Sequence, residues 1–247
     1  MSQLKSFISF LLIFSFQLTF AQKITKVDHF DKVIVSPHIE VTFIEGNEET
    51  VTIENITVGE DKLNIEVKGK TLRIYLDDAK EVPKSEKSYE DGNKVKKPIY
   101  HGTVVTATVM YKNMEELSVR GEETIVCKSV LKGDKFRLKI YGDSEVLLNE
   151  VNLDELKTTI YGESNLVIKA GSIKDQKYTA YGESKINSLG INGNTTKITV
   201  YGESDFQLNV SDEIRLTAYG EAVVNYKGNP VISKGINIGE VKINRID

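Results

Sequence analysis

The chain has 247 residues, enough for one large domain or two small ones with a buried core. Its 32 basic and 36 acidic residues give a net charge of −4, which argues against a dedicated nucleic-acid-binding protein, because such proteins concentrate an excess of Lys and Arg. A single Cys excludes an intramolecular disulfide framework and a Cys-based zinc site, since each needs several thiols.

The first 21 residues are predicted to be a secretory signal peptide. A single charge, Lys5, precedes an uncharged apolar run over residues 7–20, and a small residue, Ala21, stands at the expected cleavage site. The run is shorter than the ~20 apolar residues of a membrane-spanning helix, which makes an uncleaved anchor the weaker alternative. We therefore expect an exported protein with no transmembrane segment in its mature chain, located in the periplasm, at the cell surface or outside the cell.

The mature chain, residues 22–247, is predicted to form one all-β domain that begins irregularly. Apolar residues alternate within residues 27–76 along five short segments, which predicts strands at 33–35, 39–43, 51–53, 63–67 and 72–76. We expect them to form less regular coils that cap one end of the repeats described next. Residues 77–98 are crowded with charges, which predicts a mobile surface loop, with a linker between two domains as the alternative.

A repeat of about 20 residues dominates residues 117–243. The block Tyr-Gly-Glu-Ser occurs at 161–164, 181–184 and 201–204, and near copies surround these three. Apolar residues stand two before and four after each repeated glycine, and a second turn signal lies about midway between glycines. Short strands with regular corners stack at ~4.8 Å, so we predict a right-handed parallel β-helix, or β-solenoid, with ~20-residue coils. The repeated glycines are Gly121, Gly142, Gly162, Gly182, Gly202, Gly220 and Gly239.

Outward positions repeat as well, and they are predicted to form columns along the solenoid axis. A basic residue stands five before and a Tyr one before most of the glycines, on the strand face opposite to the apolar positions. These cations and rings suit an anionic polysaccharide or another cell-surface component, although the same ladders would also stabilise a stacked sheet without any ligand. The predicted binding residues are Arg137, Lys157, Lys177, Lys197 and Arg215, with Tyr141, Tyr161, Tyr181, Tyr201 and Tyr219.

A column of carboxylates follows the same glycines. Neighbours one coil apart would have the ~5 Å separation of a retaining glycosidase pair, but catalysis needs two carboxylates in unlike environments, and here the environments repeat. Solvated turn residues are expected, with calcium ligands as the alternative. The three histidines lie outside the repeats and no catalytic motif occurs, so we expect a protein that is not an enzyme and holds no metal or cofactor. The carboxylates are Glu122, Asp143, Glu163, Glu183, Glu203, Glu221 and Glu240.

The repeats and the segments before them resemble the head GIN domain family, which is named for autotransporter adhesins. The resemblance rests on residues 30–35, 39–44 and 72–75 and on the Tyr-Gly-Glu-Ser blocks, and it spans residues 27–243. It implies a fold like a parallel β-helix and a surface role, and it brings no catalytic or binding residues. Autotransporters carry a C-terminal membrane barrel, whereas this chain ends at Asp247 directly after the last coil, so a periplasmic location stays open.

We therefore expect an exported, noncatalytic β-solenoid that binds a glycan or another surface component through its periodic face. A structural envelope protein without a small-molecule ligand is the first alternative, and a carbohydrate-active enzyme on a β-helix is the second. An enzyme site would gather unique polar residues on one face, whereas a binding face would stay periodic.

Overall fold

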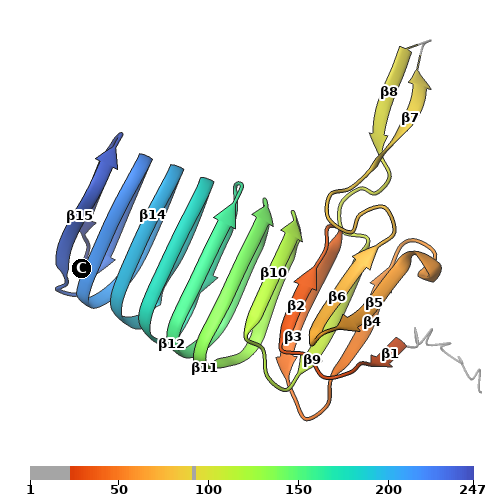
Figure 1. Ribbon diagram of the computed structural model, residues 1–247, viewed down its shortest axis with the longest axis horizontal. Coiled ribbons are helices and arrows are strands. Elements are labelled where there is room, and N and C mark those ends of the chain that lie inside the picture. The colour runs from red at the N-terminus through yellow and green to blue at the C-terminus, as the bar shows by residue number, and fades with distance from the viewer. Residues whose placement is uncertain (1–22, 91–92) are drawn as a thin grey trace, which may run out of the picture.

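The computed structural model describes residues 23–90 and 93–247, most of which lie in β-strands that coil into an elongated solenoid (Figure 1). The predicted signal peptide lies outside the described residues. Within residues 23–90 and 93–247, the helical structure is one 3-10 turn, Glu60–Lys62, and no helix is long and apolar enough to cross a bilayer. The predicted all-β solenoid with parallel strands is confirmed.

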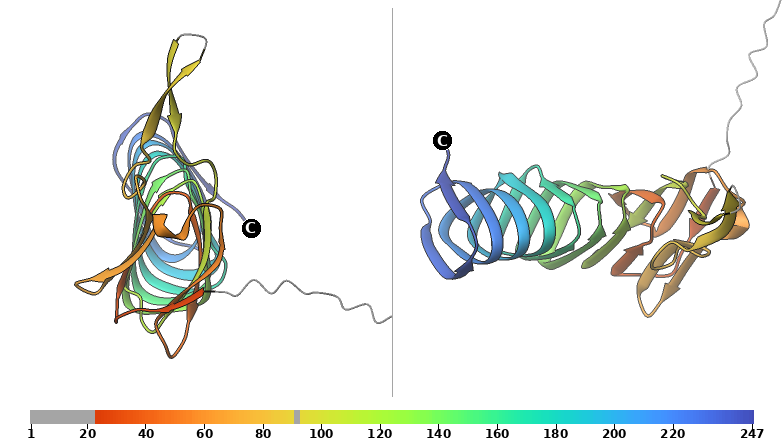
Figure 2. Two further views of the ribbon diagram at one scale, coloured as in Figure 1. Left: turned by 90° about the vertical axis from the view of Figure 1, so that its right-hand side faces the viewer. Right: turned by 90° about the horizontal axis from the view of Figure 1, so that it is seen from above.

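The repeats form the regular part of the solenoid, and their longer strands bend at the corners, as seen end on and from above in Figure 2. Pairing between successive coils is parallel and shifted by one repeat, so that Ile140 lies opposite Ile160, and Ile160 opposite Ala180. The strands are β10 (Glu116–Gly121), β11 (Thr124–Gly142), β12 (Glu145–Tyr161), β13 (Asn165–Ile168), β14 (Gly171–Lys227), β15 (Val231–Ile238) and β16 (Val241–Arg245).

The two predicted apolar columns fill the interior of the coils. Each side chain in them is at most 1% exposed, so each coil buries its apolar face between the opposite walls of the solenoid. A coil could not do this alone, which is why the repeats stabilise one another as a stack. The columns are Val119, Ile140, Ile160, Ala180, Val200 and Ala218, and Ile125, Val146, Leu166, Ile186, Phe206 and Val224.

The Tyr-Gly-Glu-Ser block forms a corner of each coil, which we call the glycine corner. Gly162 has a φ of 122°, and a Cβ placed there would collide with the carbonyl oxygen of Gly142 one coil earlier. Ser164 points inward, and its hydroxyl donates to the same carbonyl at 2.7 Å. The block therefore combines a glycine that permits close stacking with a serine that ties each corner to the preceding coil.

The N-terminal region adds two coils in an order that differs from the order along the chain. Strands β2 (Lys32–Val35) and β3 (Ile39–Glu45) lie parallel to β10 and β11, and β6 (Thr71–Leu76) and β9 (Val105–Tyr111) lie parallel to β2 and β3 on the far side. The chain thus first forms the coil next to the repeats, from β2 and β3, and then the terminal coil, from β6 and β9. It then passes back to the other side of the first coil, where the repeats begin with β10.

Antiparallel strands close this end of the solenoid. Strand β4 (Thr50–Ile56) pairs with β9, β1 (Lys23–Lys26) pairs with β4, and β5 (Leu63–Lys68) pairs with β6. Segments 51–53 and 63–67 were predicted as strands of irregular coils, and they are strands of this antiparallel cap instead. Apolar alternation is the same for parallel and antiparallel partners, so the sequence pattern could not separate the two arrangements.

The charged segment 77–98 contains a β-hairpin that projects from the cap (Figure 1). Strand β7 (Ser85–Glu90) pairs antiparallel with β8 (Asn93–Pro98), and Glu86 lies opposite Lys97. A two-stranded ladder depends on backbone hydrogen bonds, so it can form in a segment too polar to contribute to a core. The expectation of a loop is wrong for these strands.

Candidate functional site

The predicted tyrosine column is a continuous ladder on the outer face of the solenoid. Centroids of neighbouring rings are 4.7–5.1 Å apart, and their planes differ by 2–6°. Because each ring covers the faces of its neighbours, the ladder offers ring edges and hydroxyl groups to the solvent and has little face area left for a ligand. Four of the rings are 37–42% exposed: Tyr161, Tyr181, Tyr201 and Tyr219.

The predicted basic column lies beside this ladder and divides into paired ends and an unpaired centre. Arg137 lies opposite Lys157, and Lys157 opposite Lys177. At one end Arg137 Nη1 contacts Glu116 Oε2 at 2.7 Å, and at the other Arg215 Nη2 contacts Glu213 Oε1 at 2.9 Å. Within the described part of the chain, three lysines have no carboxylate oxygen within 4.0 Å of Nζ: Lys157, Lys177 and Lys197.

Nearby carboxylates on the same strand face are engaged elsewhere. Glu155, two residues before Lys157, pairs with Lys135 at 2.7 Å. Asp175, two residues before Lys177, accepts a hydrogen bond from Thr195 Oγ1 at 2.5 Å. Lys157 and Lys177 are neighbours in register on adjacent coils. At the spacing of the coils, unscreened like charges would repel by up to about 1 kcal/mol per pair in water. We call this column and the tyrosine ladder together the tyrosine–lysine face.

The carboxylate column follows the glycine corner, and all seven of its members are exposed, as expected for solvated turn residues. Part of it lines a shallow groove of about 450 Å³ that includes Glu163, Glu183 and Glu203. Among residues 23–90 and 93–247, no group of three or more His, Cys, Asp and Glu side chains is arranged to hold a metal ion.

A pocket of about 470 Å³ lies at the same corner where the repeats begin, and the sequence did not predict it. Its residues come from five separate segments of the chain, so no local pattern joins them. The available signal was a break in the repeat, because Arg120 and Glu123 stand where later coils have Tyr and Ser. The pocket is lined by Pro37, His38, Glu81, Val82, Pro83, Gly102, Arg120, Gly121, Glu122, Glu123, Tyr141, Gly142 and Asp143.

Glu123 and His38 form the inner wall of this pocket. The Glu123 side chain is only 6% exposed and accepts a hydrogen bond from the backbone N–H of Glu122 at 3.0 Å. Its burial raises the pKa of the carboxyl group above the ordinary value. His38 adopts a φ of 70°, and its Nδ1 lies 2.8 Å from the carbonyl oxygen of Gly102 and 3.7 Å from Glu123 Oε1.

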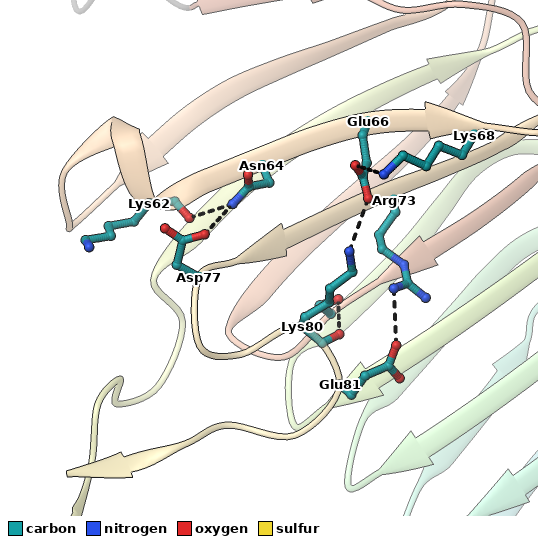
Figure 3. A network of polar contacts seen from close by, with 9 residues as sticks. Lys62, Asn64, Glu66, Lys68, Arg73, Asp77, Lys80 and Glu81 are labelled. Atoms are coloured by element: carbon teal, nitrogen blue, oxygen red, sulfur yellow. Dashed lines mark hydrogen bonds and ion pairs between the residues drawn. The ribbon is translucent and has the colours of Figure 1, made fainter.

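Arg120 joins the pocket to the N-terminal cap. Its guanidinium group pairs with Glu81, which also accepts from Arg73 at 3.2 Å (Figure 3). The same guanidinium group lies 5.4 Å from the centroid of the Tyr141 ring, so it closes the end of the tyrosine ladder. Nearby, Glu66 on β5 accepts hydrogen bonds from both Lys68 and Lys80 (Figure 3). The contact with Lys80 joins the segment before Glu81 to β5, the strand that pairs with the Arg73 strand β6.

These features define a parallel β-solenoid with a capped N-terminal end and one outer face of regular side-chain columns. The sequence matches the family model described as "Putative auto-transporter adhesin, head GIN domain" over residues 29–230. The chain therefore belongs to the head GIN domain family, and the resemblance noted from the sequence is confirmed. No curated protein matches the sequence.

Several solved structures share the fold. A "putative adhesin" from Bacteroides fragilis has a TM-score of 0.72 and 18% identity, with 91% of this chain and 96% of that chain covered. A "putative adhesin" from Parabacteroides merdae has a TM-score of 0.64 and 18% identity, with 92% and 96% covered. A "putative lipid binding protein" from Parabacteroides distasonis has a TM-score of 0.56 and 20% identity, with the same coverage. At these identities the likeness concerns the fold alone.

Proposed function

We propose that this protein is an exported, noncatalytic, adhesin-like domain that binds anionic polysaccharide through its tyrosine–lysine face. The observation that carries the proposal is the central run of unpaired ammonium groups on Lys157, Lys177 and Lys197. An extended polyanion lying along the solenoid axis would neutralise several of them at once and relieve their mutual repulsion. The tyrosine hydroxyl groups, aligned beside the lysines, would donate hydrogen bonds to sulfate or carboxylate oxygens.

A sequence prediction and the family membership support a role at a surface. The predicted signal peptide of residues 1–21 would export the chain. Membership of a family described in terms of adhesins is consistent with attachment of a cell or its envelope to a polymer. The regular coil spacing suits this task, because a polymer can bind in several registers along equivalent columns.

Binding to defined polymers over a salt series tests the proposal. We would immobilise dextran sulfate, polygalacturonate and uncharged dextran, and measure binding of the mature chain by biolayer interferometry from low to high salt. We expect binding to both polyanions to exceed binding to dextran and to weaken as salt rises, because ions screen the lysines. Equal binding to dextran and dextran sulfate, or no binding to either polyanion at low salt, would refute the proposal.

The aperiodic pocket favours a second candidate, a carbohydrate-active enzyme, because it gathers the unique polar residues that such a site needs. We propose binding rather than catalysis because the function rests on the tyrosine–lysine face, and the carboxylate column beyond the pocket repeats in similar, exposed environments. An enzyme would have to use the pocket, where the buried Glu123 lies beside the exposed Glu122. Incubating the protein with the same polymers and measuring new reducing ends and unsaturated uronates separates the two. We expect neither product, and either one would overturn the noncatalytic assignment. A purely structural envelope protein would instead bind no polymer and co-purify with envelope partners.

A further inference from the structure

The pocket at the start of the repeats differs from the tyrosine–lysine face in both shape and chemistry. Residues 81–83 cover one side of it, and the pairing of Glu81 with Arg120 and Arg73 holds that segment against the first repeat. The pocket is therefore formed before any ligand arrives, and its volume of about 470 Å³ lies in the usual range for small-molecule sites.

The charges in the pocket disfavour an anionic ligand. Glu81 is neutralised by two arginines, which leaves Glu122, Glu123 and Asp143 as the remaining carboxyl groups of the wall. Glu122 and Asp143 are exposed one coil apart. Asp143 Oδ1 accepts a hydrogen bond from the backbone N–H of Glu163 at 3.2 Å, so the acceptors at the mouth are the Glu122 carboxylate and the second oxygen of Asp143. A ligand that donates hydrogen bonds suits these oxygens, whereas a sulfate or carboxylate group would be repelled.

The rest of the lining consists of apolar side chains and of polar groups that lack some of their hydrogen-bond partners. Val82 is 76% exposed and lines the pocket with Pro37 and Pro83, so the three side chains give it an apolar wall. Arg120 Nε and His38 Nε2 are buried and have no hydrogen-bond partner in the described structure. A ligand in the pocket could form hydrogen bonds with both nitrogen atoms.

We propose that this pocket binds an uncharged saccharide unit, such as the end of a surface glycan. A sugar ring combines several hydroxyl donors with apolar C–H faces, which matches the carboxylates at the mouth and the Val82–Pro83 wall. The inference does not rest on the proposed function, because it uses different residues and a ligand of different charge.

Paired alanine variants on a neutral glycan array test this inference. The array carries uncharged oligosaccharides ending in hexose, N-acetylhexosamine or deoxyhexose, and the strongest probe is then titrated. The E122A/D143A variant removes both acceptor groups at the pocket, while E183A/E203A removes two exposed carboxylates of the same column outside it. We expect the first pair to weaken binding about tenfold or more and the second pair to leave it unchanged.

Three results would overturn the inference: no neutral glycan binds the wild-type chain, E122A/D143A binds as well as wild type, or both pairs weaken binding equally. Dextran sulfate binding is measured on the same variants. We expect E122A/D143A to retain it, so that a failure of the pocket can be told apart from a failure of the tyrosine–lysine face.

Discussion

Single residues at the glycine corner decide whether the coils can stack. Gly162 has a positive φ and lies against the carbonyl oxygen of Gly142, while the neighbouring Ser164 donates a hydrogen bond to that same oxygen. The exposed Glu163 between them makes no comparable inward contact. The repeated block therefore reflects the demands of stacking at its glycine and serine, and leaves its outward positions available for other roles.

Replacing Gly162 by Ala is expected to destabilise the solenoid by at least about 2 kcal/mol, because the backbone strain and the collision with Gly142 add. Thermal and denaturant unfolding measure the change, with E163A as the control for a side-chain change at the same corner. If G162A and E163A unfold at the same midpoint, the explanation that close stacking of the corners requires a glycine is wrong.

Glu123 should make stability depend on pH in a predictable direction. Burial raises its folded-state pKa above the value of 4.5 that applies to an unperturbed Glu, so the folded state binds more protons between those two pKa values. Its contribution to stability is therefore present at low pH and is lost as the pH rises from about 4.5 through the folded pKa.

We expect E123Q to unfold at a higher temperature than wild type at neutral pH, and the difference to shrink as the pH approaches 4.5. Thermal unfolding of both proteins between acidic and neutral pH gives the comparison. If E123Q instead unfolds at a lower temperature than wild type at neutral pH, Glu123 stabilises the fold as a carboxylate and the prediction is wrong.

Among the structural elements, the tyrosine ladder links the architecture of the sheet to its outer surface. Parallel strands in register place identical side chains above one another, so the tyrosine rings stack with their centroids 4.7–5.1 Å apart. The ladder then stabilises the sheet through its faces and offers only its edges and hydroxyl groups to a ligand. The two roles can be separated by mutation, because they use different atoms of the same side chain.

The triple variant Y161F/Y181F/Y201F should keep the ladder and lose its hydroxyl groups. We expect stability close to wild type but weaker binding of dextran sulfate. Y181A instead opens a gap between Tyr161 and Tyr201 and should lose about 1–3 kcal/mol of stability, since two ring contacts disappear. Unfolding midpoints and polymer affinity are measured for both, and a triple variant as unstable as Y181A would contradict this division of roles.

At the scale of the whole molecule, the predictable part of the fold is the part that repeats. The positions of Ile140, Ile160 and Tyr161 relative to the glycines correctly predicted that the first two are buried and the third is exposed. The reason is that successive side chains of a strand point to opposite faces of the sheet. The cap could not be predicted in this way, since alternation leaves open which partner a strand pairs with and in which direction. The pocket could not be predicted because His38, Glu81 and Glu123 meet only through the pairing of the two N-terminal coils with the first repeat, which does not follow chain order.

The distribution of charge also depends on the repeat. The net charge of −4 hides the fact that basic and acidic side chains lie in separate columns along the solenoid. Basic side chains gather on the tyrosine–lysine face, and exposed carboxylates gather at the adjoining glycine corner. Under the two proposals, a chain with a small net charge offers a cationic strip to one ligand and an acidic pocket to another. Position on the solenoid, more than composition, sets which class of ligand each surface can bind.

The most direct test of the central claim is the dissociation constant for dextran sulfate of two triple variants at low salt. K157E/K177E/K197E reverses the unpaired centre of the basic column, whereas K128E/K169E/K227E makes the same change in charge at positions seven residues after a repeated glycine. We predict that the first variant loses affinity about tenfold or more, and that the control stays near wild type. Equal losses in both variants, or no loss in the first, would contradict the account.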